Sequence, residues 1–292
     1  MPNSTDDALA KLEQGLEQGL TWDNIGKSLA SGIVSGLGGL AISELFTFLE
    51  DKKPIEELLS DFKQEIEQDL TVIITRVIYD AFRQNDLDHV IAYTRGLERN
   101  VRSEVRRRDA MLLDSDYNAS NQALSSAEQL DLLGFGTYFL VLNLRAAINQ
   151  DMRRLPPLND DPQAWYNGLW QDILELVSEG KEYVTQRANE VYRINRSRVS
   201  ILGGKTPPPG VLGFGYVITI DGIPSPADGT GTIFFNEPAS WNIAHEQENR
   251  VITRLNHEAD LKVFNPARDI MTELSKLTRT YWRPDILINT AE

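Results

Sequence analysis

The stretch that decides the fold is residues 132–144, which read Leu-Leu-Gly-Phe-Gly-Thr-Tyr-Phe-Leu-Val-Leu-Asn-Leu. After Asp131 the first charged residue is Arg145, so a helix through this stretch is apolar around nearly its whole circumference. Such a helix needs apolar surroundings on every side, either at the centre of a bundle or in lipid. We therefore predict a central apolar helix over Leu132–Met152.

The segment directly before this stretch has the opposite character. It contains few large apolar side chains and many charged ones, namely Arg102, Arg106, Arg107, Arg108, Glu104, Asp109, Asp114 and Asp116. This composition predicts a polar helix over Arg102–Asp116. A polar helix and an apolar helix then follow each other along the chain.

A second region of low polarity lies near the N-terminus, where residues 28–43 carry no charge. Ser28, Gly32 and Gly36 are spaced four apart, so on a helix they form a stripe of small residues against which another backbone can pack closely. Each Gly costs a helix about 1 kcal/mol relative to Ala, so tertiary packing has to compensate. A run shorter than about 18 residues favours buried helices over a permanent transmembrane span.

The remaining chain divides by the period of its apolar residues and by its turn residues. Residues 1–24 are predicted to be an acidic arm, 25–202 a helical bundle, 203–238 a Pro/Gly linker with a β-hairpin, and 239–292 C-terminal helices that pack on the bundle. The hairpin strands are predicted at Tyr216–Ile220 and Thr232–Phe235, with a turn at Asp221-Gly222. A helix break is expected at Asn265-Pro266, which form a good N-cap and first-turn pair.

The predicted fold class is therefore mostly α. We expect a bundle of about six or seven helices around the central apolar helix, with a small β-hairpin inserted before the last helices.

Composition excludes several classes of function. The 292 residues contain no Cys, 29 Lys and Arg, and 43 Asp and Glu, for a net charge of −14. Absence of Cys excludes disulfides, thiolate nucleophiles and Cys-ligated metals. The acidic balance argues against a nucleic-acid partner, which requires clustered basic residues. The first residues lack the basic start and apolar core of a signal peptide, so we expect synthesis in the cytoplasm.

Motifs for an enzyme are incomplete. Gly204-Lys205-Thr206 resembles the end of a phosphate-binding loop, but Val199 occupies the position of its first Gly. His245-Glu246 begins a zinc-protease phrase, but Asn249 replaces the second His. We therefore predict no catalytic residues, no metal and no cofactor. An enzyme would need a buried cluster of ionisable side chains assembled in space around a pocket.

Several phrases occur in the same order as in a known family. They are a Gly-rich apolar stretch (Gly32–Phe48), Val-Ile-Tyr-Asp-Ala-Phe (77–82), Asp-His-Val-Ile-Ala-Tyr (88–93), a polar helix (Val101–Leu113), Val-Leu-Asn-Leu-Arg-Ala-Ala (141–147), Tyr-Val-Thr (183–185) and Ser-Trp-Asn (240–242). Over Ile25–Ser200, with a return at Trp241–Leu277, the chain resembles the helical pore-forming first domain of the three-domain Cry δ-endotoxins. It departs from that family in the Gly203–Pro238 insertion and in lacking the two receptor-binding β domains, so receptor targeting and proteolytic activation are not carried over.

The resemblance implies that the protein is released and acts at a target membrane. There the polar and apolar helices leave the bundle as a hairpin, permeabilise the membrane and assemble into a homo-oligomer. A helix of about 20 residues rises about 30 Å, which is sufficient to cross the hydrocarbon layer. On this basis the lipid-facing or central positions are Leu133, Phe139, Leu140, Leu142 and Leu144. The pore-lining positions are Asp109, Asp114 and Asp116, because a charge at mid-bilayer is costly unless it faces water.

The same apolar run is equally consistent with a core helix that never leaves its bundle. The alternative function is therefore a non-enzymatic interaction or structural protein, in which an acidic face or the 211–236 hairpin binds a protein partner.

Overall fold

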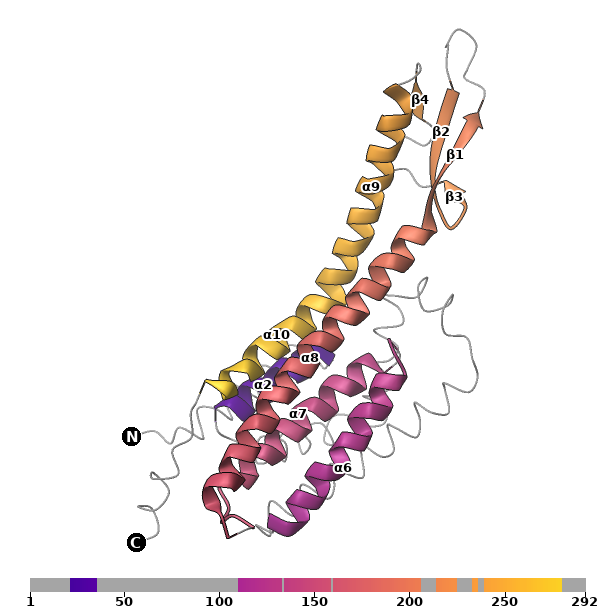
Figure 1. The fold of residues 1–292 in the computed structure, drawn as a ribbon. Coiled ribbons are helices and arrows are strands. Elements are labelled where there is room, and N and C mark those ends of the chain that lie inside the picture. Colours follow the sequence, from indigo (N-terminus) through magenta and orange to yellow (C-terminus); the bar gives the residue numbers. More distant parts are fainter. Residues whose placement is uncertain are drawn as a thin grey trace. The chain divides into compact units, whose positions relative to one another are not determined.

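The computed structural model describes residues 22–35, 110–132, 134–158, 160–205, 214–224, 233–235 and 239–279. Its helices and strands, in chain order, are α2 (Trp22–Val34), α6 (Ala110–Gln129), α7 (Phe135–Met152), α8 (Pro162–Arg198), β1 (Val199–Lys205), β2 (Phe214–Ile220), β3 (Ile223–Pro224), β4 (Ile233–Phe235), α9 (Ala239–Ala259), a π-helix (Asp260–Phe264), α10 (Asn265–Leu274) and a 3₁₀ turn (Ser275–Thr278) (Figure 1).

The chain forms two compact units. Unit 1 comprises Met1–Val184 and Asn265–Glu292, and unit 2 comprises Thr185–Phe264. The described part is mostly helical with one small antiparallel sheet, which confirms the predicted fold class. Five described helices contribute to unit 1, namely α2, α6, α7, α10 and the first part of α8, fewer than the six or seven predicted. The predicted domain boundaries stay predictions.

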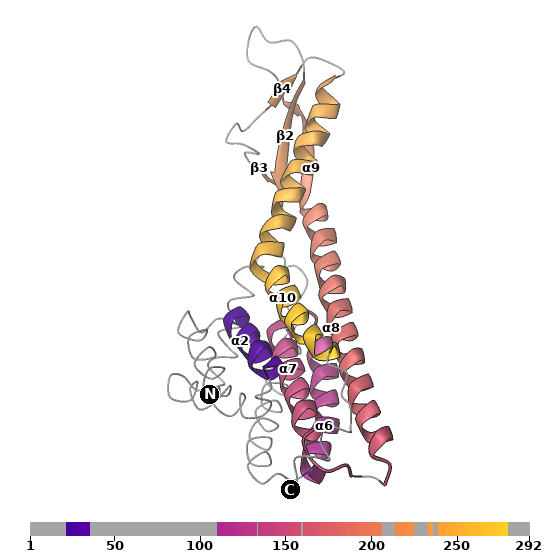
Figure 2. The same ribbon diagram turned by 90° about the vertical axis from the view of Figure 1, so that its left-hand side faces the viewer.

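Helix α7 is the core of unit 1. Of its 18 residues only Gln150 is not buried, as the apolar circumference of the sequence predicts. Helices α2 and α6 pack directly against it (Figure 2). Asn149 of α7 donates to the Leu169 carbonyl of α8. The central apolar helix therefore exists, and it begins at Phe135 rather than Leu132.

The turn between α6 and α7 explains that shift. The polar helix continues past Asp116 to Gln129, and Asp131 then adopts a left-handed conformation with φ 54°. A Cβ on Gly134 would overlap the carbonyl oxygen of Ala127, so only Gly allows α7 to begin this close to the end of α6. Two antiparallel helices result, joined by a short turn.

Helix α2 and helix α10 also approach each other closely in unit 1. A Cβ on Gly26 would overlap Cδ1 of Ile270 and lie 3.3 Å from its Cγ1. Close packing in this region was predicted at Ser28, Gly32 and Gly36. Gly32 is buried and Ser28 is partly buried, whereas Gly36 lies outside the described residues.

Unit 2 is built on the antiparallel sheet, in which β1 and β4 both pair with β2. The pairing of Phe214–Tyr216 with Ile233–Phe235 confirms the two predicted strands. Strand β1 differs from the prediction, which places Val199–Lys205 at a helix end and in a linker. A core of Val199, Ile218 and Val251 joins the sheet to α9 and orders this segment as a strand.

The regular α-helix is interrupted before Asn265-Pro266. In unit 2, α9 ends at Ala259 and a π-helix follows to Phe264; in unit 1, α10 begins at Asn265, the residue predicted to start the helix after the break. Pro266 has no N–H to donate, and the wider π turn ends immediately before this residue pair. Within unit 2, Tyr192 donates a 2.5 Å hydrogen bond to Oδ1 of Asp260, and its ring contacts Phe264.

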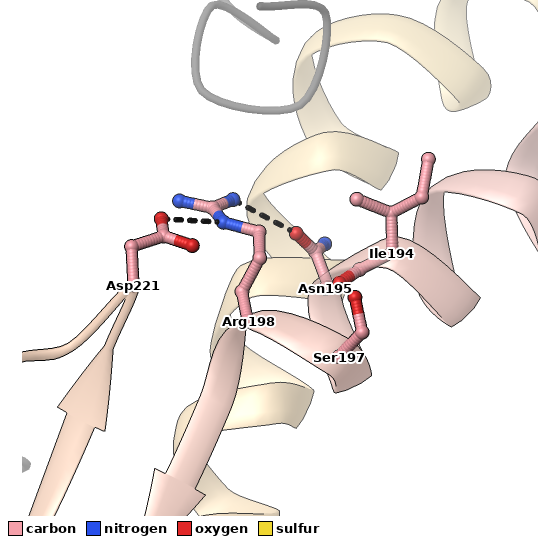
Figure 3. A network of polar contacts seen from close by, with 5 residues as sticks. All are labelled: Ile194, Asn195, Ser197, Arg198 and Asp221. Carbon is pink, nitrogen blue, oxygen red and sulfur yellow. Dashed lines mark hydrogen bonds and ion pairs between the residues drawn. The ribbon is translucent and has the colours of Figure 1, made fainter. Parts of the chain in front are cut away.

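A partly buried ion pair connects the turn between β2 and β3 to the end of α8 (Figure 3). Nε of Arg198 lies 2.9 Å from Oδ2 of Asp221, and its Nη1 donates to Oδ1 of Asn195 at 3.1 Å. Asp221 (φ 56°) and Gly222 (φ 78°) form the predicted tight turn between β2 and β3. The Asp221 N–H donates to the Arg198 carbonyl, so one arginine organises both the helix end and the turn.

Candidate functional site

The N-terminal half of α7 packs in an aromatic cluster. Phe135, Tyr138 and Phe139 all contact the ring of Tyr183 from α8, and the Tyr138 and Tyr183 rings stack at 3.9 Å. The Tyr183 hydroxyl donates to the Asp131 carbonyl at 2.9 Å, which places this cluster against the α6–α7 turn. Dispersion and burial of these rings contribute to holding this half of α7 in the bundle.

The C-terminal half of α7 carries buried polar groups at a helical spacing. Arg145, Asn149 and Arg153 follow one another every four residues and share one face. Nη1 of Arg145 lies 3.5 Å from the Tyr117 carbonyl and 3.4 Å from Oγ of Ser120, and the guanidinium lies 4.1 Å from the Tyr117 ring centroid. Arg145 therefore connects α7 to α6.

The other two members of this face connect α7 to α8. Nδ2 of Asn149 donates to the Leu169 carbonyl at 2.9 Å, and Nη2 of Arg153 donates to the same oxygen at 3.1 Å. Both side chains are almost fully enclosed, with exposed fractions of 0% and 2%. Burial of a charged donor costs free energy unless the donor is hydrogen-bonded. These two bonds therefore help to hold α7 against α8.

The surroundings of this face disfavour charge. Burial lowers the pKa of Arg153 to about 10. Burial also raises the pKa of Asp172 in α8, and the nearby Arg145 offsets this only in part. A raised pKa means that the ionised carboxylate of Asp172 lowers the free energy of unfolding. Protonation of this carboxyl by acid therefore removes that destabilisation of the folded bundle.

The predicted site residues lie in three different environments. Phe139, Leu140, Leu142 and Leu144 are buried in α7. Asp116 is buried in α6, whereas Asp114 is partly exposed and accepts a hydrogen bond from Asn118 at 3.4 Å. Leu133 and Asp109 lie outside the described residues. The lipid-facing and pore-lining roles stay predictions.

Sequence reasoning missed the polar face of α7. Its signal was present as the four-residue spacing of Arg145, Asn149 and Arg153. The acceptor was not visible, because a backbone carbonyl at Leu169 has no sequence signature.

The described residues contain a cluster of ionisable side chains inside the bundle, in which Arg145 and Arg153 donate to backbone carbonyls and Arg145 also lies 3.4 Å from Oγ of Ser120. Within the described ranges, no three His, Asp or Glu side chains gather as a metal site. His245 pairs with Glu248 at 2.9 Å on α9. None of the described helices combines the length and the hydrophobicity needed to cross a membrane. Comparisons of the chain with protein-family models, with curated proteins and with solved structures gave no match.

The buried phenols of this region predict a loss of stability in alkali. Burial raises the pKa of Tyr117 to about 12, and it raises the pKa of Tyr138 as well. In the unfolded chain both titrate near 10, so the free energy of unfolding falls as the pH rises from about 10. Arg153, with its lowered pKa, opposes this fall, because its buried charge is lost in the same range.

Tyr138→Phe isolates one phenol, because it keeps the ring that stacks on Tyr183 and removes the titrating hydroxyl. Between pH 10 and 11 the free energy of unfolding of the wild type should fall by about 1 kcal/mol more than that of this variant. Urea unfolding followed by circular dichroism at each pH measures the difference. Parallel stability curves for the two proteins would contradict the assignment.

Proposed function

We propose that the protein permeabilises membranes by inserting the α6–α7 hairpin, released from its folded bundle, into a lipid bilayer. The observation that carries the proposal is the complete burial of α7 in unit 1, including the apolar residues Phe139, Leu140 and Leu142. The N-terminal half of α7 is apolar around nearly its whole circumference, and such a surface is stable either in a bundle core or in lipid.

The proposal is supported by the energetics of moving α7 between these environments. Lipid chains are as apolar as a protein core, so the aliphatic side chains of α7 lose little hydrophobic stabilisation when they move into a bilayer. The free-energy cost of insertion therefore comes mainly from the polar groups of α7. A lone Arg at mid-bilayer costs about 2.5–3.5 kcal/mol on insertion scales.

Helix α6 supplies the partner that Arg145 needs. The guanidinium lies over the Tyr117 ring and beside two oxygens of α6, so an α6–α7 pair carries these contacts with it. The turn at Gly134 keeps the two helices adjacent. The hairpin rather than α7 alone is therefore the inserting element, as the resemblance to the Cry pore-forming domain implies.

Release of an entrapped fluorescent dye from lipid vesicles by the full chain tests this function. The chain carries a net charge of −14, and residues 1–70 hold 14 Asp and Glu against 5 Lys and Arg. We expect faster release from neutral phosphatidylcholine vesicles than from vesicles containing phosphatidylserine at low salt. In about 0.15 M salt the two vesicle types should differ less in release rate, because charges are screened over a length of about 8 Å.

Two results would count against this account. Absence of release from every vesicle composition contradicts the function. Faster release from anionic vesicles contradicts the role given to the acidic charge.

A second candidate, binding of a protein partner by unit 2, is favoured by one observation. The Trp241 side chain is 49% exposed, although its ring contacts Tyr216 at 5.6 Å and His245 at 4.3 Å. Aromatic side chains of this kind are enriched in protein interfaces. Vesicles that stay intact, together with a Trp241-dependent complex, would favour this candidate.

A further inference from the structure

The seam between α7 and α8 has a single polar contact point among the described hydrogen bonds. Asn149 and Arg153, one turn apart on α7, both donate to the Leu169 carbonyl, at 2.9 and 3.1 Å. Leu169 is itself buried, so this point lies inside unit 1 rather than at its surface.

The two seams of α7 differ in their geometry. Toward α6, Arg145 makes contacts of 3.4 and 3.5 Å, which are long for hydrogen bonds, and lies over the Tyr117 ring. Toward α8, the two bonds have ordinary lengths and converge on one oxygen. The contacts to α6 move with the hairpin, whereas those to α8 have to break before it leaves.

We infer that Asn149, Arg153 and the Leu169 carbonyl form a latch that keeps α7 against α8 and that unit 1 opens along this seam. The inference rests on the proposed function, because it identifies the step that precedes insertion. The latch is only partly satisfied: within the described part of the chain, Oδ1 of Asn149 and Nε of Arg153 have no partner at hydrogen-bond distance. A partly satisfied polar network holds a seam less firmly than a fully paired one.

Cysteine labelling in solution tests the latch without any membrane. The chain contains no Cys, so one introduced thiol reports on one site. Thr137→Cys places a thiol on α7, 12 positions before Asn149, and Ala267→Cys places one on α10; the native side chains are 5% and 0% exposed. The rate of maleimide labelling at each site measures how often that helix opens.

Removing the latch should open α7 selectively. We expect Asn149→Ala and Arg153→Met, made singly in the full chain, to raise the labelling rate of the Thr137→Cys reporter about tenfold. The Ala267→Cys reporter should keep its rate. Arg154→Met is the matched control, since Arg154 is the adjacent arginine with a half-exposed side chain, and it should change neither rate.

The possible outcomes separate the latch from general stability. Equal acceleration at both reporters would mean that the residues stabilise unit 1 as a whole, and this would overturn the inference. An unchanged rate at Thr137→Cys would overturn it as well. If one latch variant fails to fold, which its circular dichroism shows, the other single variant decides between these results.

The same experiment distinguishes the latch from the function it serves. If the latch variants label faster at the Thr137→Cys reporter but the protein releases no dye from vesicles, the proposed function is wrong and the latch is confirmed. If the wild type releases dye but neither latch variant labels faster at the Thr137→Cys reporter, the latch is wrong and the proposed function is supported.

Discussion

An oxidised cysteine pair at Leu142 and Gly180 is expected to abolish dye release from vesicles. A Cβ on Gly180 of α8 would lie 2.8 Å from Cδ1 of Leu142 in α7, so the two positions are in contact across the seam between these helices. Replacement of both by Cys and oxidation gives the test pair, and the assay uses only protein in which thiol titration shows that the bond has formed. The bond would tie α7 to α8 and prevent the hairpin from leaving. Met271, whose Sδ would lie 2.7 Å from the new Cβ, has a flexible side chain that can move aside.

A matched pair in the same unit provides the control. Gly26→Cys with Ile270→Cys links α2 to α10, where the Gly26 Cβ position lies 3.3 Å from Cγ1 of Ile270. This bond leaves the α6–α7 hairpin free, so the oxidised control should release dye at the rate of its reduced form. Reduction of the Leu142–Gly180 bond should restore release. Equal release from the oxidised and reduced forms of that pair would contradict insertion of the hairpin.

Gly134→Ala is expected to have the largest effect of a single methyl group on stability. The new Cβ would overlap the Ala127 carbonyl oxygen, which is backbone and cannot rotate away. The turn would have to open and move the first residues of α7, including Phe135, out of the aromatic cluster with Tyr183. We expect a loss of about 3 kcal/mol or more in the free energy of unfolding, measured by urea titration.

Gly168→Ala serves as the control for this substitution. Gly168 lies inside α8, and a Cβ there would meet no atom within 4 Å. Alanine is the better helix former by about 1 kcal/mol, so this variant should be as stable as the wild type or more stable. Equal effects of the two substitutions would show that the α6–α7 turn is not as close as described.

The long periodic segments of the fold could be predicted from sequence. The run at Leu132–Leu144 predicted α7 and its burial, because apolar side chains around a whole helix admit few environments. The Asp221-Gly222 turn was predictable because both residues tolerate positive φ, and the structure gives them 56° and 78°.

Tertiary contacts decided what the sequence analysis missed. Strand β1 begins directly after α8 because Val199 and Ile201 pack on the core shared with α9. Contacts with residues distant in sequence form this core, so local secondary-structure propensity does not predict it. The polar face of α7 could be seen in the spacing of Arg145, Asn149 and Arg153, but its acceptors are backbone carbonyls contributed by other helices.

The most direct test uses vesicles that contain a lipid with a photoactivatable group in its acyl chain. Illumination after addition of the wild-type chain, followed by digestion and mass spectrometry, identifies the residues that touch the hydrocarbon. We predict that cross-links concentrate between Tyr138 and Leu142, side chains that are enclosed in the folded bundle. Vesicles that leak while every cross-link falls outside α7 would contradict the account.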